Sequence, residues 1–361
     1  MLPRLLPRLL RVLAVILLAA GLVVLIWPQA FGLHNTAVVA HAVSFRGVLV
    51  VAAITAAVVL IGLLSLRCGW RTVATLLVLT VLFGAANASI LAGRGLGAGA
   101  TESAGSAPTA DPADAVTVLS WNTLGDAPGA TAIADLALAE GADVVSLPET
   151  TEEAGVAIAQ RMRAGGRPMW VHTVAFDLVS KARSTTLLIS PDLGDYTVAS
   201  SAGRGPPGNT NVVPTVVATP VTGSGPTIVA VHAVAPIRYE MANWRSDLDW
   251  LAGQCDGTRS STENVIMAGD FNATVDHLAG RAASAAHSPA AVLGECVDAA
   301  SAAGSGAVGT WPTRVPALLG SPIDHVFATP NWQVDEMRVI STLDGDGSDH
   351  RPVVATLSPN V

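Results

Sequence analysis

Three long runs without a charged residue lie in the first 93 residues of this 361-residue chain, and they constrain its fold most: Val12–Phe31, Gly47–Leu66 and Thr72–Gly93. Each run is about 20 residues or longer, which lets a helix rising about 1.5 Å per residue cross a hydrocarbon core of about 30 Å. Buried helices of that length in soluble proteins normally keep a polar face, and these runs have none. The sequence therefore predicts a three-helix membrane anchor over residues 1–93.

The arginines near these runs predict how the anchor is oriented. A cleaved signal peptide would account only for the first run, which is longer than a usual signal core. Cytoplasmic loops carry the excess of positive residues, and five arginines lie on one side against two on the other. We therefore expect a multi-pass cell-membrane protein with a cytoplasmic N-terminus and an extracytoplasmic C-terminal part. The five are Arg4, Arg8, Arg11, Arg67 and Arg71, and the two are Arg46 and Arg94.

The chain beyond the anchor is strongly acidic. All 28 acidic residues lie at or beyond Glu102, and the 13 basic residues that follow residue 100 leave a formal balance of 13 − 28 = −15. Non-specific affinity for nucleic acids comes mainly from lysine and arginine. Nucleic acid is therefore disfavoured as a partner, although a bound metal ion reverses the sign of the charge locally.

A composition shift separates the anchor from the acidic region. Residues Ala92–Ala115 are rich in Gly, Ala, Ser, Thr and Pro and offer nothing that buries a core. Such a composition is typical of a flexible tether. We therefore place an anchor at residues 1–93, a linker at 94–115 and a globular domain at 116–361.

The globular region alternates short apolar strands with helical spacing. This mixture predicts an α/β sandwich of about 245 residues, without fixing the order of its strands. The expected helices are Ala130–Glu140 and Met241–Leu251. The expected strands are Val116–Trp121, Asp143–Leu147, Thr185–Ser190, Val212–Ala218, Thr227–His232, Asn264–Ala268, Ile323–Ala328 and Arg351–Leu357.

Polar motifs lie where six of these strands begin or end. Taken singly, each is typical of a turn or a helix cap. The order and spacing of all six together indicate one active site instead. The motifs are Leu119–Asn122, Leu147–Glu149, Val231–His232, Gly269–Asn272, Ile323–His325 and Gly347–Pro352.

Read in that order, the motifs resemble the endonuclease/exonuclease/phosphatase superfamily, which includes DNase I-like nucleases, inositol polyphosphate 5-phosphatases and sphingomyelinases. The resemblance covers residues 116–357. It implies a four-layer αββα sandwich and metal-dependent hydrolysis of phosphate ester or anhydride bonds.

Hydrolysis at phosphorus needs a cation to neutralise charge, an oriented water molecule and help for the leaving oxygen. Glu149 is the candidate for the principal metal ligand, because a hard carboxylate suits Mg²⁺, with Mn²⁺ as the alternative. Asn122 and Asp349 would complete the metal site, directly or through water.

The resemblance also implies the catalytic roles. Asp270 and Asn272 would position the attacking water and bind the phosphate, and their spacing of two puts both on one face of an extended segment. His350 would contact the scissile phosphate. Asp324 would accept its ring N–H and favour its charged form. His232 would be a second histidine that stabilises the phosphate.

Other polar residues receive structural roles. His325 should face the opposite side of the strand from Asp324, and Asp143 belongs to a helix-to-strand turn. Asp344 and Asp346 are interpreted as loop residues, with a second metal site there as the alternative.

Three arginines and two cysteines each allow two interpretations, one functional and one purely structural. Arg204, Arg238 and Arg314 would clamp additional substrate phosphates, or they are simply exposed to solvent. Cys255 and Cys296 would form a disulfide in an oxidising compartment, or they are buried thiols.

The three membrane helices ahead of such a domain resemble the actinobacterial teicoplanin-resistance membrane protein family. That similarity implies a substrate among the phosphorylated lipids of the cell envelope, such as a lipid-linked pyrophosphate. Family members often have Gln before the metal-binding Glu, whereas Pro148 stands here and stiffens the backbone. The alternatives are a membrane-anchored nuclease and a non-catalytic module that binds envelope lipids or an antibiotic. The sequence makes no prediction of oligomeric state.

Overall fold

The computed structural model describes residues 2–66, 69–97, 115–177, 179–198, 204–222, 225–256, 264–282 and 292–360. Two compact units make up the chain, Met1–Gly93 and Arg94–Val361. Most of the predicted linker, residues 98–114, lies outside the described residues.

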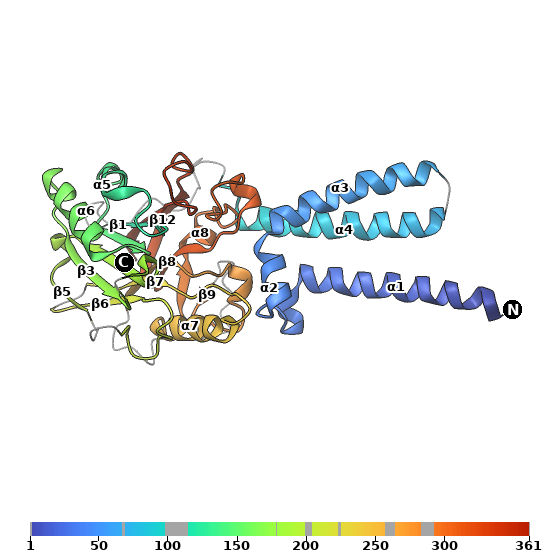
Figure 1. Cartoon of the computed structure of the whole chain (residues 1–361), viewed down its shortest axis with the longest axis horizontal. Coiled ribbons are helices and arrows are strands. Elements are labelled where there is room, and N and C mark those ends of the chain that lie inside the picture. Colours follow the sequence, from blue (N-terminus) through green and yellow to red (C-terminus); the bar gives the residue numbers. More distant parts are fainter. Residues whose placement is uncertain are drawn as a thin grey trace. The chain divides into compact units, whose positions relative to one another are not determined.

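The first unit is helical, and three of its helices are long and apolar enough to span a membrane. The first of them ends earlier than predicted, at Ile26 instead of Phe31. Pro28 disfavours helical geometry in the residue before it, and residues 28–31 form a 3₁₀ helix instead. The α-helices are α1 Leu2–Ile26, α2 Ala37–Ser44, α3 Arg46–Ser65 and α4 Trp70–Arg94 (Figure 1).

A buried arginine links the helices within this unit. Arg46 donates to Asn87 Oδ1 at 2.7 Å and to the Leu25 carbonyl oxygen at 3.3 Å. Both Arg46 and Asn87 are buried. A charge among apolar helices is tolerated where it finds polar partners, so this pair favours a defined arrangement of α3 and α4.

The second unit contains two β-sheets. The first has the strand order β12-β13-β1-β2-β4-β3 and the second has the order β5-β6-β7-β8-β11-β10-β9. The first sheet comprises β1 Val116–Ser120, β2 Val144–Pro148, β3 Trp170–Ala175, β4 Ser184–Ile189, β12 Trp332–Val339 and β13 Val353–Pro359. The second comprises β5 Tyr196–Val198, β6 Val216–Pro220, β7 Thr227–His232, β8 Val265–Asp270, β9 Val292–Leu293, β10 Cys296–Asp298 and β11 Asp324–Ala328.

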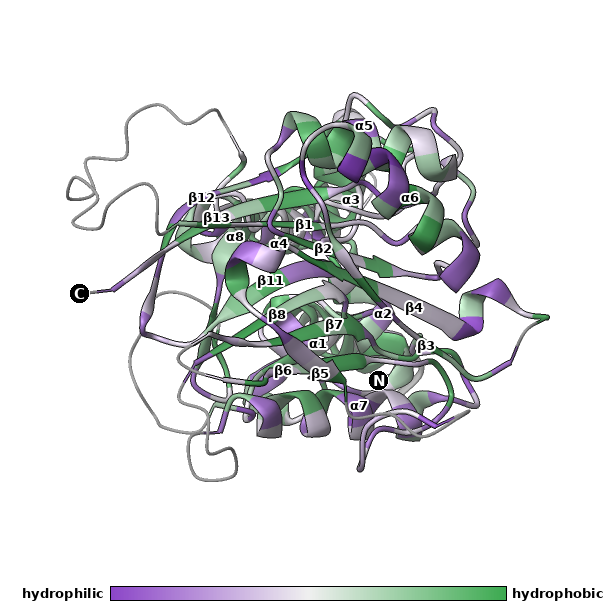
Figure 2. Ribbon diagram, turned by 90° about the vertical axis from the view of Figure 1, so that its left-hand side faces the viewer, coloured by the Kyte–Doolittle hydropathy of each residue, from purple (hydrophilic) through white to green (hydrophobic). Residues whose placement is uncertain are grey.

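The two sheets pack face to face, and helices cover their outer faces (Figure 2). Successive side chains of β1 point to opposite faces of the sheet. Val118 belongs to the hydrophobic cluster between the two sheets, and Leu119 belongs to the cluster beneath the outer helices. This arrangement confirms the predicted four-layer αββα sandwich. The helices are α5 Gly129–Ala139 and α6 Glu152–Ala164 on the first sheet, α7 Met241–Gln254 on the second, and the short α8 Ala299–Ala302.

One predicted strand begins later than expected. The strand expected at Val212–Ala218 is β6, which starts at Val216. Pro214 has no N–H to donate to a ladder, and Asn211 has a left-handed φ of 44°. The chain therefore turns through residues 211–214 before it joins the sheet.

Both sheets end their central strands on the same side, which we call the site edge. β1 and β2 run parallel, as do β7 and β8, so their last residues lie together. Within the second sheet, Asp270 is paired with His232 on β7 and with Asp324 on β11. Three adjacent strands thus bring polar side chains to one place.

Gly269 is required for the close approach of β7 and β8 at this edge. Its φ is 152°, and a Cβ atom at that position would lie 2.0 Å from the Val231 carbonyl oxygen. Any other residue would push Asp270 away from His232 on the neighbouring strand. Steric exclusion of a Cβ atom thus explains why the Gly269–Asn272 motif begins with glycine.

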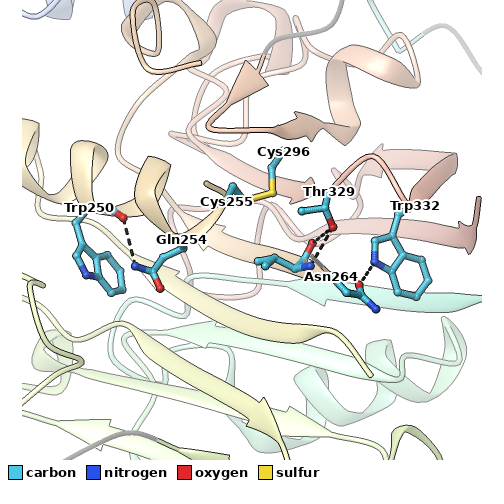
Figure 3. The surroundings of a disulfide bond; sticks show 8 residues. Trp250, Gln254, Cys255, Asn264, Cys296, Thr329 and Trp332 are labelled. Atoms are coloured by element: carbon cyan, nitrogen blue, oxygen red, sulfur yellow. Dashed lines mark hydrogen bonds between the residues drawn. A yellow bond between two sulfur atoms is a disulfide. The ribbon is translucent and has the colours of Figure 1, made fainter. Parts of the chain in front are cut away.

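Cys255 and Cys296 form a disulfide with a Cα–Cα distance of 5.6 Å (Figure 3). The bridge joins the C-cap of α7 to β10. It therefore fastens the helix layer to a strand near the margin of the second sheet.

The first residues of the second unit are hydrogen-bonded to the globular part. Arg94 donates to both carboxylate oxygens of Asp276, at 2.9 and 2.7 Å, and its carbonyl accepts the Gly306 N–H at 2.9 Å. Gly97 donates to the Gly304 carbonyl at 3.2 Å. Residues 94–97 are thus part of the folded unit.

Candidate active site

The site edge brings together side chains from both sheets. They occupy the last positions of strands or the turns next to them, which is where sheet geometry lets polar groups converge without disrupting a ladder. The first sheet contributes Asn122, Glu149, Asp349 and His350, and the second contributes His232, Asp270, Asn272 and Asp324.

His350 is held by an aspartate. Its Nδ1 lies 2.9 Å from Asp324 Oδ2, and its backbone N–H donates to Ser348 Oγ at 3.0 Å. Burial by itself would lower the pKa of His350, but the carboxylates of Asp324 and Asp270 outweigh it and raise the pKa well above its ordinary value. His350 is therefore a cation at neutral pH, and its Nε2 lies 3.9 Å from Asp270 Oδ2.

Asp270 is the most densely hydrogen-bonded carboxylate of the site. Its Oδ1 accepts the Asn272 N–H at 2.7 Å, and its Oδ2 accepts from the side-chain amide of Asn122 at 3.0 Å. Burial, with the charge of Asp324 second, raises the pKa of Asp270 well above its ordinary range. A carboxylate with a raised pKa is suited to accept a proton near neutral pH.

Two residues of the site adopt strained backbone conformations. Glu149 and Asn272 have φ values of 60° and 47°. Non-glycine residues in this left-handed region cost about 1–3 kcal/mol each and persist where their surroundings fix them. Hydrogen bonds do so here: Thr123 Oγ1 donates to the Glu149 carbonyl at 3.0 Å, and Trp244 Nε1 donates to the Asn272 carbonyl at 3.0 Å.

Glu149 and Asp349 offer the oxygens best suited to a divalent cation. Asp349 Oδ2 accepts from Trp311 Nε1 at 2.9 Å, whereas its buried Oδ1 has no hydrogen-bond partner among the described residues. Burial raises the pKa of Glu149, and the nearby charge of Asp349 raises it further. A carboxylate with a raised pKa beside one with an unpaired oxygen fits a hard cation such as Mg²⁺.

A second group also brings potential ligand atoms together. One atom each from Asp270, Asp324 and His350 lies within 4.8 Å of the others. The charged His350, however, already donates to Asp324 and presents a proton instead of a lone pair. This group is therefore better suited to hydrogen bonding than to holding the cation.

Asn122 was expected to complete the metal site, directly or through water, and its side chain makes three hydrogen bonds there. Its Oδ1 accepts the Leu124 N–H at 3.0 Å, and its Nδ2 donates to Asp270 and, at 3.2 Å, to Glu149 Oε1. With its oxygen engaged, Asn122 bridges the two sheets and holds both carboxylates in place.

His232 lies next to Glu149. Its Nε2 is 3.9 Å from Glu149 Oε1, and its backbone N–H donates to Thr215 Oγ1 at 3.1 Å. Burial, with the positive charge of His350 second, lowers the pKa of His232 to about 3. A neutral imidazole here donates one N–H, which suits a phosphate oxygen.

The three candidate substrate arginines are not drawn into this cluster. Arg204, Arg238 and Arg314 are exposed on loops, and no hydrogen bond or ion pair joins them to the site among the described residues. The Arg238 guanidinium lies over the Tyr239 ring, 5.9 Å from its centroid. They stay candidates for contacts outside the central cluster.

The residues given structural roles occupy such positions. His325 faces away from the site and bonds Asp298 at 2.9 Å. Asp143 accepts the Thr117 N–H and pairs with Arg167. The loop residue Asp344 pairs with Arg351 at 2.6 Å.

Several residues that position the side chains of the site were not identified from the sequence. Trp311 binds Asp349, and Thr310 Oγ1 accepts the Asp324 N–H at 3.1 Å. The buried Arg351 donates to the Gly309, Thr313 and Val315 carbonyls and so fixes the loop that carries Trp311. Arg351 adjoins His350 in the last motif, a usable signal, whereas Thr310 and Trp311 lie outside every motif.

The sequence of the chain also matches a known protein family. The model of the Endonuclease/Exonuclease/phosphatase family matches residues 119–350, which is more than half of the chain. The chain therefore belongs to this family, whose members are generally phosphoester hydrolases that depend on divalent metals. No curated protein matches the chain significantly.

The chain is also similar to solved structures, at low sequence identity. An endonuclease/exonuclease/phosphatase from Beutenbergia cavernae is 20% identical, with 68% of this chain and 72% of that chain covered and a TM-score of 0.48. One from Bacteroides vulgatus is 18% identical, with 68% and 99% covered and a TM-score of 0.47. The mannosyl-6-phosphatase Bt3783 of Bacteroides thetaiotaomicron is 14% identical, with 67% and 99% covered and a TM-score of 0.45.

Proposed function

We propose that this protein is a membrane-anchored phosphoesterase that acts outside the cytoplasm on phosphate ester or anhydride bonds. The observation that carries the proposal is the pairing of Asp270, a carboxylate with a raised pKa, with the cationic His350 at 3.9 Å. This places a proton acceptor beside a donor for an anionic oxygen, which hydrolysis at phosphorus requires.

The residues divide the work as follows. Asp270 takes a proton from water while the new bond to phosphorus forms, and Asn272 helps to orient that water. His350 and His232 donate N–H groups to the non-bridging phosphate oxygens, whose charge grows as the leaving oxygen departs. Asp324 keeps His350 protonated and aligned through the 2.9 Å contact.

Glu149 and Asp349 would hold Mg²⁺, or alternatively Mn²⁺, with Asn122 keeping Glu149 in place. When bound, the ion neutralises phosphate charge and stabilises the leaving oxygen. The unpaired Asp349 Oδ1 and the raised pKa of Glu149 support this assignment.

We assign the substrate to the phosphorylated lipids of the cell envelope. The acidic balance of the globular unit opposes polyanionic nucleic acid, and three apolar helices could span a membrane. Both features agree with the resemblance to the teicoplanin-resistance membrane proteins. Arginine placement favours an extracytoplasmic active site, and the Cys255–Cys296 disulfide supports an oxidising compartment.

The test uses the full chain reconstituted in lipid nanodiscs. Hydrolysis of undecaprenyl pyrophosphate, a sphingomyelin-like phosphodiester, an inositol phosphate and supercoiled DNA is compared with Mg²⁺ and with EDTA, by phosphate release for the first and third, phosphomonoester release for the second and nicking for DNA. We expect Mg²⁺-dependent release from the lipid pyrophosphate. Nicking of DNA faster than lipid turnover would establish the nuclease instead.

Matched variants separate catalysis from binding. Asp270→Asn keeps the volume of the side chain and should abolish hydrolysis, whereas Asp335→Asn, at an exposed position of β12, should not change it. Release that persists in EDTA would contradict the proposed role of the metal, and release that persists in Asp270→Asn would contradict the proposed role of Asp270.

A further inference from the structure

The loops around the active site emerge from one side of both sheets. The last residue of β3, Ala175, pairs with the first residue of β4, Ser184, next to the pair formed by Pro148 and Thr185. The loop between β3 and β4 therefore lies at the site edge. The same reasoning places there the loops that follow β1 and β7, the loop that precedes β11 and, because β6 runs antiparallel to β7, the residues that precede β6, with Arg204 among them.

Exposed apolar side chains gather on these loops. Five of the nine large apolar residues that are exposed in the described part of the second unit lie there, and they include the two most exposed, Val179 at 94% and Tyr239 at 86%. The five are Leu124, Val179, Ile237, Tyr239 and Leu318, and the other four are Leu96, Val156, Trp170 and Val221.

Unpaired arginines accompany them. Arg204, Arg238 and Arg314 are exposed, and none has a carboxylate partner among the described residues. Arg167 and Arg338 each form an ion pair elsewhere in the unit, and Arg183 pairs with Asp177 within the loop between β3 and β4. The site edge of an acidic domain therefore presents positive charge next to apolar tips.

Ile237, Arg238 and Tyr239 concentrate this combination in three successive residues. They lie on the loop that begins directly after His232, so the apolar tips stand beside the catalytic cluster. Tyrosine and arginine are stable together at a membrane interface, where the ring meets acyl chains and the guanidinium meets phosphates. Basic residues near the surface of an anionic leaflet are attracted to it.

We propose that the site edge docks onto the surface of an anionic lipid bilayer, with Val179, Ile237 and Tyr239 entering the interface and the three arginines facing lipid phosphates. The apolar residues stand on two separate loops, which suits a fluid lipid surface better than the continuous apolar core of a protein interface. The candidate membrane spans of the same chain keep a bilayer close to the domain.

Docking gives the site direct access to a phosphate at headgroup depth, so a lipid substrate reacts without leaving the bilayer. This consequence rests on the proposed function, whereas the docking itself does not. Docking is favourable by itself, because transfer of an exposed apolar side chain from water into the membrane interface lowers its free energy.

The docking is tested by depth-dependent fluorescence quenching on the full chain in nanodiscs of 7:3 phosphatidylcholine and phosphatidylglycerol. An environment-sensitive fluorophore is attached to Tyr239→Cys in a Cys68→Ser background, and lipids spin-labelled on the acyl chain quench it. The matched control is Val221→Cys, since Val221 is also exposed but follows β6 at the opposite edge. We expect at least about threefold stronger quenching at position 239.

Equal quenching at the two positions would overturn the docking proposal. In pure phosphatidylcholine, or at high salt, the difference should shrink because attraction to anionic lipid is screened. A difference that does not respond to lipid charge would overturn the role of the arginines.

Activity supplies a separate readout. The double variant Ile237→Ser and Tyr239→Ser should lose about tenfold in turnover of phosphatidic acid in nanodiscs. It should keep turnover of the soluble bis-p-nitrophenyl phosphate. If the wild type hydrolyses neither substrate, the proposed function fails whatever the quenching shows; if it hydrolyses both and the variant loses neither, the docking proposal fails.

Discussion

Two aspartate–histidine pairs lie on opposite sides of β11, and they differ in what surrounds them. In the site pair, on the side of β11 that faces the candidate active site, His350 Nδ1 and Asp324 Oδ2 are 2.9 Å apart. In the core pair, buried on the opposite side, His325 Nδ1 and Asp298 Oδ1 are 2.9 Å apart. Asp324 and His325 are neighbours in sequence. The alternation of a strand thus sends one member of each pair to each face.

The core pair is fully satisfied. His325 Nε2 bonds the Ala273 carbonyl at 3.0 Å, and Asp298 also accepts the backbone and side-chain donors of Ser301. The site pair is not: Asp324 Oδ1 has no partner among the described residues, and His350 Nε2 faces carboxylates 3.9 and 4.0 Å away. Unused bonding capacity marks the pair that meets a substrate, because a buried polar group is otherwise paired.

The largest effect should come from removing the imidazole of the site pair. His350→Gln should lower phosphate release about 10³-fold, since a positioned proton donor and charge stabiliser contributes about 10²–10⁴-fold. Turnover and melting temperature are measured together. His172→Gln, on the outer strand β3, is the matched control and should keep full activity. A loss in His350→Gln that merely follows unfolding would contradict the assignment.

The core pair should show the reverse pattern. Asp298→Asn leaves His325 buried without its counter-charge and should lower the free energy of unfolding by about 3–5 kcal/mol, with turnover per folded molecule nearly unchanged. Denaturant titration and active-site counting measure the two quantities. A large loss of turnover in the folded fraction would show that the two pairs are not separate.

The same pair predicts how stability depends on pH. Burial opposes charge on His325, but Asp298 raises its pKa above 6.5, so this stabilisation is present below pH 6.5 and is lost as pH rises through the higher folded pKa. Burial would raise the pKa of Asp298, but His325 lowers it below 3.8, so that stabilisation is present above pH 3.8 and is lost on further acidification. Asp298→Asn should therefore flatten the dependence at both ends.

A smaller effect should follow from neutralising the aspartate of the site pair. Asp324→Asn removes a charge that raises the pKa of His350, so the imidazolium should lose its proton at lower pH. We expect about a tenfold loss of turnover near neutral pH and an alkaline limb displaced to lower pH. An unchanged alkaline limb in a pH–rate profile would show that Asp324 does not set the charge of His350.

The sequence predicted the parts of the molecule that follow local rules. The three helices that could span a membrane follow from length and hydropathy, and strands such as Thr227–His232 agree residue for residue because both of their ends carry turn or polar signals. Helix α6 and the strands β3 and β12 were missed. Their faces are mixed, and β12 is only partly buried, so apolar periodicity is weak there.

The site was predictable where residues belong to the six motifs, and not where contacts depend on the meeting of two sheets. Asn122 was expected at the metal site, but the sequence did not show that its amide bridges Glu149 on its own sheet and Asp270 on the other. Likewise, nothing in the sequence links Trp311 to Asp349, because the loop that joins them is fixed by the buried Arg351.

The smallest effect should come from the hydrogen bond that Trp311 donates to Asp349. Trp311→Phe keeps the ring and removes the N–H that holds Oδ2, so the unpaired Oδ1 should be less well aimed at the cation. A lost bond to a charged group of about 1 kcal/mol corresponds to about a fivefold rise in the Mg²⁺ concentration for half-maximal activity. Trp332→Phe is the matched control, since it loses a similar bond to Asn264 far from the site (Figure 3). If both variants shift the Mg²⁺ requirement equally, Trp311 acts through general packing and not through Asp349.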